Sequence, residues 1–366
     1  MKILYAIQGT GNGHITRSIS IINELKKRAD VDVLISGIHN EIKSPIDINF
    51  NFRGLGFVFG QNGGIDYYKT YKQNKLSTLF KEIKQLPVKD YNFVVSDFEP
   101  VSVWAASKAG IPTIGISNQV SVLHPKIKKP WPPISISRVF MENYAQCDYN
   151  IGLHFEAIDE HIITPVIREE IRLGNNTDEG HGLVYLPFYS DEIIFKALKN
   201  IDTIEWIVFS KHSKKTYKIG NVQFEPVNGQ LFNEKLLSCH IVLTAAGFGT
   251  TSEALHLGKK MIVIPMKGQY EQKFNAFTLQ KFGVKILKSL ESKDAPILIN
   301  SVLDSSACFK MNYPDNAKLI SDKVIELYNG PILENLNFST NSKNQPLDSY
   351  FNPPKINRDN SGTLSY

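Results

Sequence analysis

The sequence is short of cysteine and has no long apolar run. Its 366 residues include only three cysteines, Cys147, Cys239 and Cys308, and no CxxC pair. This usage argues against a disulfide framework and fits a reducing compartment. Because no run of about 18 apolar residues occurs, no transmembrane helix is expected, and the first residues lack the pattern of a signal peptide. We therefore expect a cytoplasmic protein.

Patterns for nucleic acid binding are also missing, since no helix-turn-helix, RNP or zinc-finger pattern occurs. The charge, in contrast, is uneven. Residues 1–150 contain 18 Lys and Arg against 12 Asp and Glu, a net charge of +6, whereas the remainder has a net charge of −1. A basic first half suits an anionic partner or the anionic inner face of a membrane, where the protein would be peripheral. Ordinary solvated lysines explain it as well.

Strand-like and helix-like segments alternate along the chain, which at 366 residues is long enough for two domains. In the first half the expected strands are 2–7, 32–36, 93–96 and 112–116, and the expected helices are 14–29, 72–86, 100–109 and 136–146. In the second half the expected strands are 183–188, 205–210, 222–226, 240–247 and 260–265, and the expected helices are 191–199, 231–237, 250–257 and 271–281.

This alternation predicts an α/β protein with two tandem Rossmann-like, doubly wound parallel sheets that face each other across a cleft. The expected domains are residues 1–165 and 183–330, joined by a linker at 166–182. Residues 331–366 are rich in Asn, Ser and Pro and poor in aliphatic residues. Such a tail cannot bury enough apolar surface to fold alone, so we expect it to be flexible or draped over one domain.

A loop of alternating glycines, "GTGNGH" at 9–14, follows the first strand. A dinucleotide fold needs a glycine where His14 stands, and no "GK[ST]" follows, so neither nucleotide-loop pattern fits. His14 falls in the first turn of the next helix, where the helix dipole disfavours the imidazolium form. A neutral imidazole with open space beside it suits a general base, although a capping or packing role is the alternative.

Asp97, in "VVSDFEP", ends another strand at the same predicted sheet edge. Its carboxylate can orient His14 through a ring N–H, and Glu99 is the second choice. Capping the next helix is the alternative for both residues. The same segment is the nearest match to a carboxylate pair that could hold Mg²⁺, but it looks more like a helix start, so we predict no metal site.

The stretch 243–283 is the most informative in the chain. A strand ends at Gly247-Phe248-Gly249, and Thr250, Thr251 and Ser252 then open a helix. Unpaired N–H groups and the helix dipole at that point favour a phosphate or diphosphate. Glu253 has the spacing of a capping box, and its functional alternative is a carboxylate that binds the vicinal diol of ribose.

The next helix start carries Glu271 and Gln272, in "KGQYEQKFNA". Side by side at a strand-to-helix turn, the two side chains could bind sugar hydroxyls. Both residue types are also common in first helical turns without any ligand role.

The pattern "AAGFGTTSEALHLGKKMIVIP…YEQKFNA", preceded by "GTGNGH", resembles the nucleotide-sugar glycosyltransferases of the GT-B fold over about residues 1–330. Within that class it resembles the N-acetylglucosaminyltransferases of lipid II synthesis and related archaeal and bacterial proteins described only as glycosyltransferases. The resemblance implies Gly247, Gly249, Thr250 and Thr251 on the donor diphosphate, Glu253 on the ribose, Glu271 and Gln272 on the donor sugar, and Ser210 as an extra phosphate or base contact. It implies His14 as the base that deprotonates the acceptor, with Gly11 and Gly13 beside the diphosphate or the acceptor headgroup.

Two departures from the family limit what can be carried over. Asn12 interrupts the glycine pair that usually precedes the histidine in the lipid II enzymes, and the "HCGWNS" signature of the plant enzymes is absent. The expected function is transfer of a sugar from a nucleotide donor, UDP-linked by expectation, to a hydroxyl acceptor in cell-envelope, polysaccharide or glycolipid synthesis. We expect inversion and neither metal nor cofactor. The segment "HPKIKKPWPP" (124–133) is an acceptor-side lid, a membrane contact for a lipid-linked acceptor, or an ordinary loop.

Two other functions fit the same architecture. A nucleotide-sugar epimerase would bring further carboxylates to the cleft and would change the sugar without an acceptor. A non-catalytic nucleotide-sugar-binding subunit would tolerate loss of the His14 side chain, whereas an enzyme would lose activity on the order of 10²-fold or more.

Overall fold

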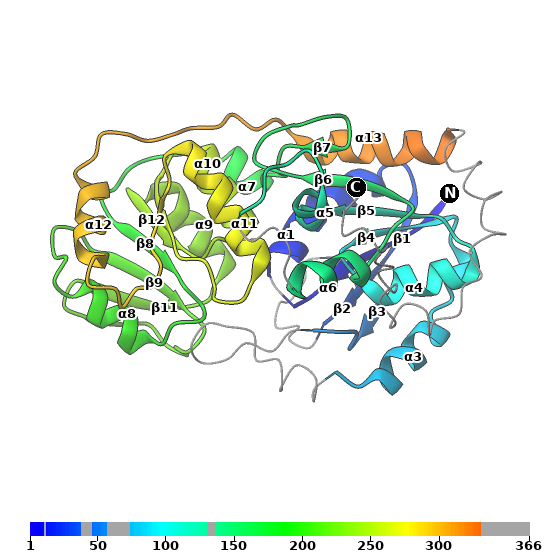
Figure 1. Cartoon of the computed structure of the whole chain (residues 1–366), viewed down its shortest axis with the longest axis horizontal. Coiled ribbons are helices and arrows are strands. Elements are labelled where there is room, and N and C mark those ends of the chain that lie inside the picture. Colours follow the sequence, from blue (N-terminus) through cyan, green and yellow to red (C-terminus); the bar gives the residue numbers. More distant parts are fainter. Residues whose placement is uncertain (11, 38–45, 57–73, 131–135, 331–366) are drawn as a thin grey trace, which may run out of the picture.

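The computed structural model describes residues 1–10, 12–37, 46–56, 74–130 and 136–330. The chain forms two lobes side by side, each a seven-stranded sheet flanked by helices (Figure 1). No helix within the described ranges is long and apolar enough to cross a bilayer. Gly11, residues 131–133 and the tail 331–366, for which the sequence makes predictions, lie outside the described residues.

The first lobe contains a fully parallel sheet with the strand order β3-β2-β1-β4-β5-β6-β7. Its strands are β1 (Lys2–Gln8), β2 (Asp30–Ser36), β3 (Phe50–Phe52), β4 (Phe93–Asp97), β5 (Thr113–Ser117), β6 (Tyr149–Leu153) and β7 (Ile162–Ile163), and its helices are α1 (Asn12–Lys26), α3 (Leu76–Gln85), α4 (Pro100–Ala109), α5 (Asn118–Leu123) and α6 (Ile136–Tyr144), with the 3₁₀ turn η1 (Val88–Asp90). Central strands such as β4 are buried on both faces, which explains their continuous apolar sequence.

The second lobe repeats the plan with the strand order β10-β11-β9-β8-β12-β13-β14. Its strands are β8 (Gly182–Tyr185), β9 (Trp206–Ser210), β10 (Tyr217–Ile219), β11 (Val222–Pro226), β12 (Ile241–Thr244), β13 (Lys260–Val263) and β14 (Lys285–Ile286), and its helices are α7 (Glu169–Arg172), α8 (Asp191–Leu198), α9 (Gly229–Ser238), α10 (Phe248–Leu257), α11 (Tyr270–Leu279), η2 (Gln280–Phe282) and α12 (Ala295–Leu303). Only β10, at the sheet edge, runs antiparallel to its neighbour.

The predicted fold class is confirmed, because both sheets are parallel-dominated and doubly wound. Each strand predicted from the alternation lies within or overlaps an observed one, and α4 and β11 have the predicted bounds. Some of the elements that were not predicted are very short or lie at a sheet edge, namely β3, β7, β10, β14, α5, α7 and the 3₁₀ turns η1 and η2. Strand β6, helix α12 and the helix that follows it were also not predicted. A two-residue strand such as β7 or β14 is too short to give a periodic pattern.

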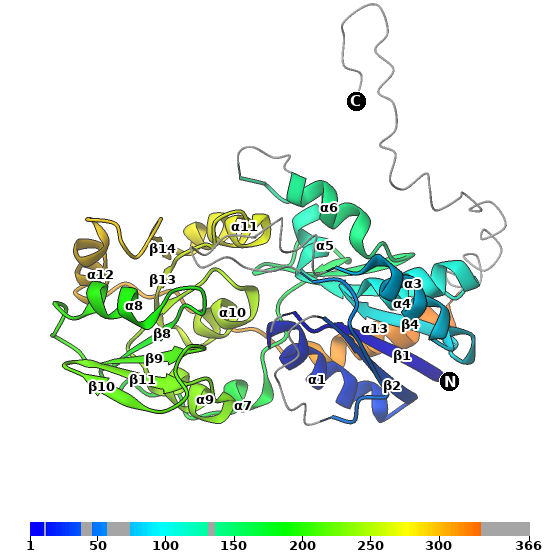
Figure 2. The same cartoon turned by 90° about the horizontal axis from the view of Figure 1, so that it is seen from below.

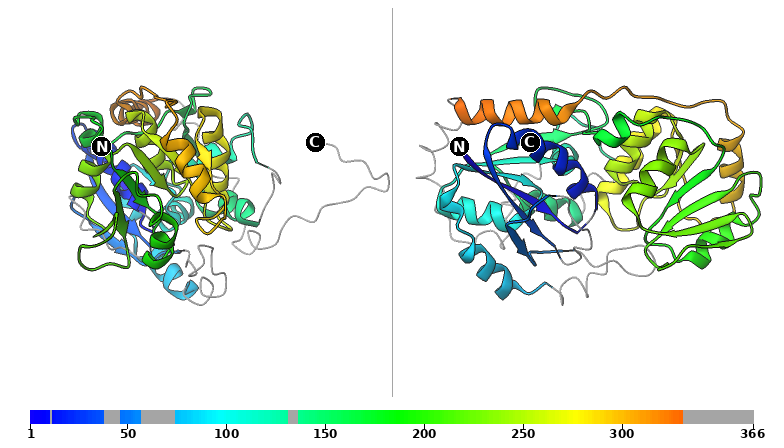
Figure 3. Two further views of the ribbon diagram at one scale, coloured as in Figure 1. Left: turned by 90° about the vertical axis from the view of Figure 1, so that its left-hand side faces the viewer. Right: turned by 180° about the vertical axis from the view of Figure 1, so that it is seen from behind.

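The last described helix, α13 (Asn316–Asn329), corrects the predicted domain boundary. After α12 the chain crosses back, and α13 lies against the first lobe, where it contacts α1 (Figure 3). Arg28, in the turn after α1, donates to the Ser321 hydroxyl at 2.7 Å, and the rings of Phe93 and Tyr328 stack with their centroids 5.2 Å apart. The helix therefore packs with the first domain rather than with the second, to which the sequence analysis extends residues 183–330.

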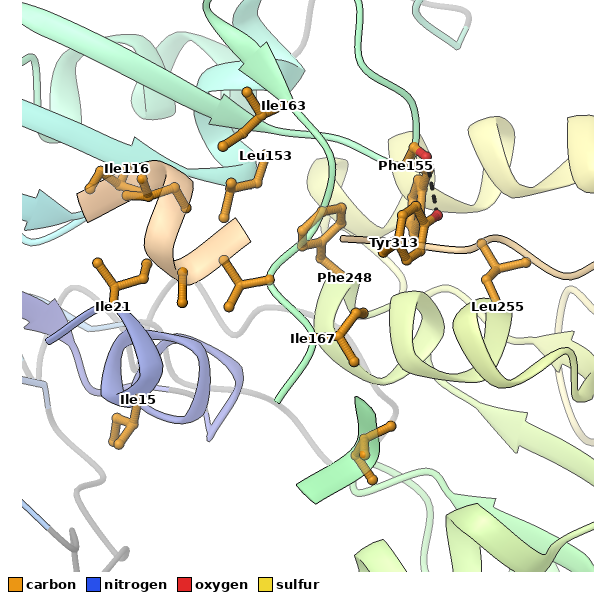
Figure 4. Packing of buried hydrophobic residues seen from close by; sticks show 14 of the residues in the cluster. Ile15, Ile21, Ile116, Leu153, Phe155, Ile163, Ile167, Phe248, Leu255 and Tyr313 are labelled. Atoms are coloured by element: carbon orange, nitrogen blue, oxygen red, sulfur yellow. Dashed lines mark hydrogen bonds between the residues drawn. The ribbon is translucent and has the colours of Figure 1, made fainter. Parts of the chain in front are cut away.

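Apolar side chains join the two lobes at their junction. The rings of Phe155, which follows β6, and Phe248, which begins α10, lie 5.0 Å apart between their centroids. The Tyr313 hydroxyl donates to the carbonyl of Phe155 at 3.1 Å (Figure 4). The buried cluster around them contains residues of both sheets, so the junction is packed as a core.

The return of α13 to the first lobe predicts a stability difference between two adjacent residues. Ile320 is fully buried, whereas Leu319 beside it is 41% exposed. We expect Ile320→Ala to lower the free energy of unfolding by about 3 kcal/mol, because it leaves a cavity under α13, and Leu319→Ala to change it by less than about 0.5 kcal/mol. Urea unfolding followed by circular dichroism measures both. Equal losses in the two variants would contradict this packing.

Candidate active site

Three residues on one face of α1 meet the end of β4. The spacing i, i+3, i+4 aligns His14, Arg17 and Ser18 on the helix surface. The pairing of β1 with β4 sets Ile7 opposite Asp97, so the turn between β1 and α1 lies beside the Asp97 carboxylate. The structure brings the predicted pair together, since Nδ1 of His14 lies 2.8 Å from Oδ1 of Asp97.

Asp97 has more partners than the sequence predicts. The Arg17 guanidinium donates from Nε to Oδ2 at 2.7 Å and from Nη2 to Oδ1, and the Ser18 hydroxyl donates to Oδ2 at 3.1 Å. Burial alone would raise the pKa of this fully buried carboxyl, but Arg17 and His14 beside it lower that pKa to about 2. Asp97 therefore stays ionised across the neutral range.

A strained residue separates Asp97 from the second predicted candidate, Glu99. Phe98 has a φ of 55°, an uncommon conformation for a bulky side chain. The next residue, Glu99, accepts from the N–H groups of Val101 at 2.8 Å and Ser102 at 2.7 Å. Glu99 is thus the N-cap of α4, and Asp97 is the carboxylate that reaches His14.

The glycine turn of the second lobe faces that of the first. A Cβ built on Gly13 or on Gly247 would meet no atom within 4 Å, and one on Gly249 would lie 4.0 Å from the Cα of Gly13. All three glycines have ordinary negative φ values, so here the absent side chain provides space rather than backbone freedom. The two turns approach closely and leave open space beside them.

Two helix N-termini converge at this space. α1 contacts α10, and α5 contacts α11, across the junction (Figure 2). Gly247, the N-cap of α10, supplies no side-chain hydrogen bond to the first turn. Uncapped N–H groups and the positive ends of two helix dipoles favour an anion at this place.

The three residues that open α10 have different surroundings. Thr251 is fully buried, and its hydroxyl donates to the carbonyl of Gly247 at 2.6 Å, so this hydroxyl already has a protein partner. Thr250 is partly exposed, and no hydrogen bond of its side chain is found within the described part of the chain. The backbone and Thr250 are therefore the donors that an anion can use here.

Glu253 forms an ion pair that the sequence analysis does not predict. Arg168, at the start of α7 in the linker, donates from Nε to Oε1 at 2.6 Å and from Nη2 to Oε2 at 2.7 Å. Glu253 is 5% exposed. Both of its oxygens already have a partner, so a ribose diol must use the remaining lone pairs of this carboxylate or displace Arg168.

Glu271 and Gln272, at the start of α11, face different neighbours. Gln119 of the first lobe donates to Oε2 of Glu271 at 2.8 Å, a hydrogen bond between the lobes. Burial raises the pKa of Glu271, and the nearby His14 and Arg17 act in the opposite direction. Oε1 of Gln272 accepts the N–H of Met266 at 2.9 Å, which leaves its amide nitrogen for a ligand.

Ser210, for which the resemblance implies a phosphate or base contact, has protein partners for its hydroxyl. Its side chain is buried, donates to the Asp191 carboxylate and accepts the N–H of His212 at 3.0 Å. These contacts shape the loop after β9 and take up the hydroxyl. Within the described ranges, no group of three or more His, Cys, Asp or Glu residues is arranged to hold a metal ion.

Four polar residues of this site were missed by the sequence analysis: Arg17, Ser18, Gln119 and Arg168. Helical spacing from His14 was a usable signal for Arg17 and Ser18. For Gln119 and Arg168 the sequence carries no signal, because their partners come from the other lobe.

The chain matches the family model described as glycosyl transferase family 1 over residues 1–302. A comparison with curated protein sequences gives no match. Three solved structures are similar in fold: the spinosyn forosaminyltransferase SpnP (13% identity, TM-score 0.54, covering 92% of this chain and 99% of that one), the Streptomyces sp. SF2575 glycosyltransferase SsfS6 with thymidine diphosphate (14%, 0.55, 89% and 96%) and Arabidopsis thaliana UGT89C1 with UDP (15%, 0.55, 93% and 98%).

At such low identity these structures support the fold, and the family model supports the activity. The predicted kinship with the lipid II enzymes is not tested by these matches. The family model spans both lobes, from β1 to α12. This chain therefore belongs to glycosyl transferase family 1 and is a glycosyltransferase with the GT-B fold.

Proposed function

We propose that this enzyme transfers a sugar from a UDP-sugar to a hydroxyl acceptor, with inversion at the anomeric carbon and without a metal ion. One observation carries the proposal: the His14–Asp97 pair lies beside the glycine turn that opens α10. A base and an anion site are then adjacent, as a displacement of a nucleoside diphosphate requires.

In this mechanism His14 acts as the general base. With its Nδ1–H donated to Asp97, the ring keeps a lone pair on Nε2. The acceptor hydroxyl loses its proton to Nε2 while its oxygen attacks the anomeric carbon from the face opposite the diphosphate. The bond between that carbon and the diphosphate oxygen breaks, UDP leaves with the electron pair, and the configuration inverts.

The N-terminus of α10 stabilises the departing diphosphate. Its uncapped N–H groups and the Thr250 hydroxyl donate to the phosphate oxygens, a role that a metal ion has in other enzymes. Glu271 and the free amide of Gln272 bind the sugar hydroxyls, and Glu253 shares its remaining lone pairs with the ribose.

The resemblance to the lipid II enzymes supports an acceptor of the cell envelope, carried on a lipid, and the basic first half supports contact with an anionic membrane surface. In the segment proposed for that contact, Lys126 pairs with Asp159 at 2.9 Å, and Lys129 donates to the carbonyls of His124 and Ile127. Lys128 remains exposed. The membrane contact therefore involves fewer free charges in this segment than its sequence suggests.

The function is tested with a panel of nucleotide-sugars, first by thermal shift and then by transfer to hydroxyl acceptors. We expect a UDP-sugar to raise the melting temperature of the wild type, and His14→Ala to reduce transfer by on the order of 10²-fold or more while keeping that shift. Sugar isomerisation without an acceptor would indicate an epimerase. Full function of His14→Ala would indicate a binding subunit.

The open space beside Gly247 generates a second prediction. Gly247→Ala fits without a clash in the ligand-free protein, but its methyl group would occupy the place of the diphosphate. We expect at least about a tenfold loss of UDP affinity, measured by calorimetry, with an unchanged melting temperature. Gly229→Ala, which also meets no atom within 4 Å but lies at the start of α9, is the control and should bind UDP normally. Equal affinities in both variants would contradict the assigned anion site.

Metal independence is a third prediction. If helix α10 alone stabilises the diphosphate, transfer in EDTA should equal transfer with added Mg²⁺ or Mn²⁺. Initial rates after dialysis against the chelator measure this. An activity that is lost in EDTA and restored by either cation would overturn the proposal of a metal-free mechanism.

A further inference from the structure

Arg17 has no role in the mechanism described so far, although it is central to the site. Its side chain is 9% exposed and spans both oxygens of Asp97. The same Nη2 atom that bonds Oδ1 of Asp97 also lies 2.8 Å from Nδ1 of His14. Arg17 therefore contacts both members of the proposed base pair.

These contacts compete at one atom. A guanidinium can only donate and a carboxylate can only accept. Nδ1 of His14 lies 2.8 Å from each, so it either accepts from Arg17 or donates to Asp97, but not both. In the first case the ring proton is on Nε2 and the ring cannot act as a base there, whereas in the second case Nε2 is free to accept a proton.

Arg17 also offsets the negative charges that surround the His14 ring. Asp97 on β4 and Glu271 on α11 are the carboxylates that face the ring, and both would stabilise an imidazolium. Tyr5 on β1 is fully buried near Asp97, and burial keeps its phenol protonated and neutral. The N-terminal ends of α1 and α10 add partial positive charge. Arg17 is the full positive charge among these groups.

We propose that Arg17 is a positioning residue that holds Asp97 in place to bind the Nδ1–H of His14 and, by its charge, prevents His14 from remaining protonated. The bidentate pair fixes both oxygens, so Oδ1 is aimed at Nδ1. The positive charge offsets Asp97, so the proton that Nε2 takes from the acceptor is released again. The inference deepens the proposed function and depends on it for its kinetic part only.

The pH profile of kcat/KM tests the charge effect. Activity needs unprotonated His14, so its loss at low pH reports protonation of the ring. In Arg17→Met the uncompensated carboxylates should move this acidic limb to higher pH by about one unit. Arg17→Lys keeps the charge, so the acidic limb should stay at the wild-type pH. Its kcat should fall on the order of tenfold, because the bidentate geometry is lost.

Arg28→Met is the matched control. Arg28 also forms an ion pair, with Asp322 at 2.8 Å, but it lies in the turn after α1, beyond the end of the helix opposite to His14. Its loss should leave the limb unchanged. The proposal is overturned if folded Arg17→Met has the limb of the wild type, or if it raises only the KM for the donor, which would make Arg17 a donor ligand.

One further variant is used if Arg17→Met does not fold, and one further measurement distinguishes failure of this inference from failure of the proposed function. If Arg17→Met does not fold, Arg17→Gln, which keeps an N–H donor for Asp97 but lacks the charge, takes its place, and the same shift of the acidic limb to higher pH is expected. Independently of activity, ¹⁵N spectra of histidine-labelled full chain, with His14→Gln to assign the signal, should show the proton on Nδ1. A proton on Nε2 in the wild type would overturn the inference even if transfer is observed, whereas absent transfer with a proton on Nδ1 would overturn the proposed function alone.

Discussion

Both halves of the site depend on one constraint: the strands of a parallel sheet all end at the same edge, and the following helices begin there. In the first lobe this rule brings the end of β1, the end of β4 and the start of α1 together. In the second lobe it brings the starts of α10 and α11 to one edge, after β12 and β13. Because the two edges face each other, the proposed base and the proposed anion site become neighbours although they lie far apart in the sequence.

A buried charge makes the first of these edges rigid. Taking a carboxylate such as Asp97 out of water costs several kcal/mol unless it is fully paired. Arg17, Ser18 and His14 supply that pairing from a single helix face, so α1 is fixed in rotation as well as in position. The strained backbone of Phe98 follows from the same arrangement, because Asp97 must face α1 while Glu99 caps α4.

The sequence was sufficient to predict the features that depend on local residue patterns. Alternating strands and helices, the glycine turns and the neighbourhood of His14 and Asp97 all follow from residues that are close in sequence or that end strands of one sheet. It was not sufficient where partners meet only after the lobes assemble. The sequence around Glu253 does not indicate that Arg168 is its partner, and the sequence around Glu271 does not indicate Gln119. The apolar face of α13 could pack against either domain, and only its contact with α1 shows that it belongs to the first.

Those assembled contacts also constrain how a donor can bind. Glu253 and Glu271 already accept hydrogen bonds, from Arg168 and Gln119 respectively. Hydrogen bonds from ribose or sugar hydroxyls would therefore replace or share existing ones, and the net gain of such an exchange is small, at most about 1 kcal/mol each. Among the described residues, by contrast, no side chain caps the N-terminus of α10 at Gly247. Most of the donor affinity should then come from the diphosphate, while the two carboxylates discriminate among sugars and nucleotides, because a ligand that displaces Arg168 or Gln119 without replacing their hydrogen bonds leaves a buried charge unpaired.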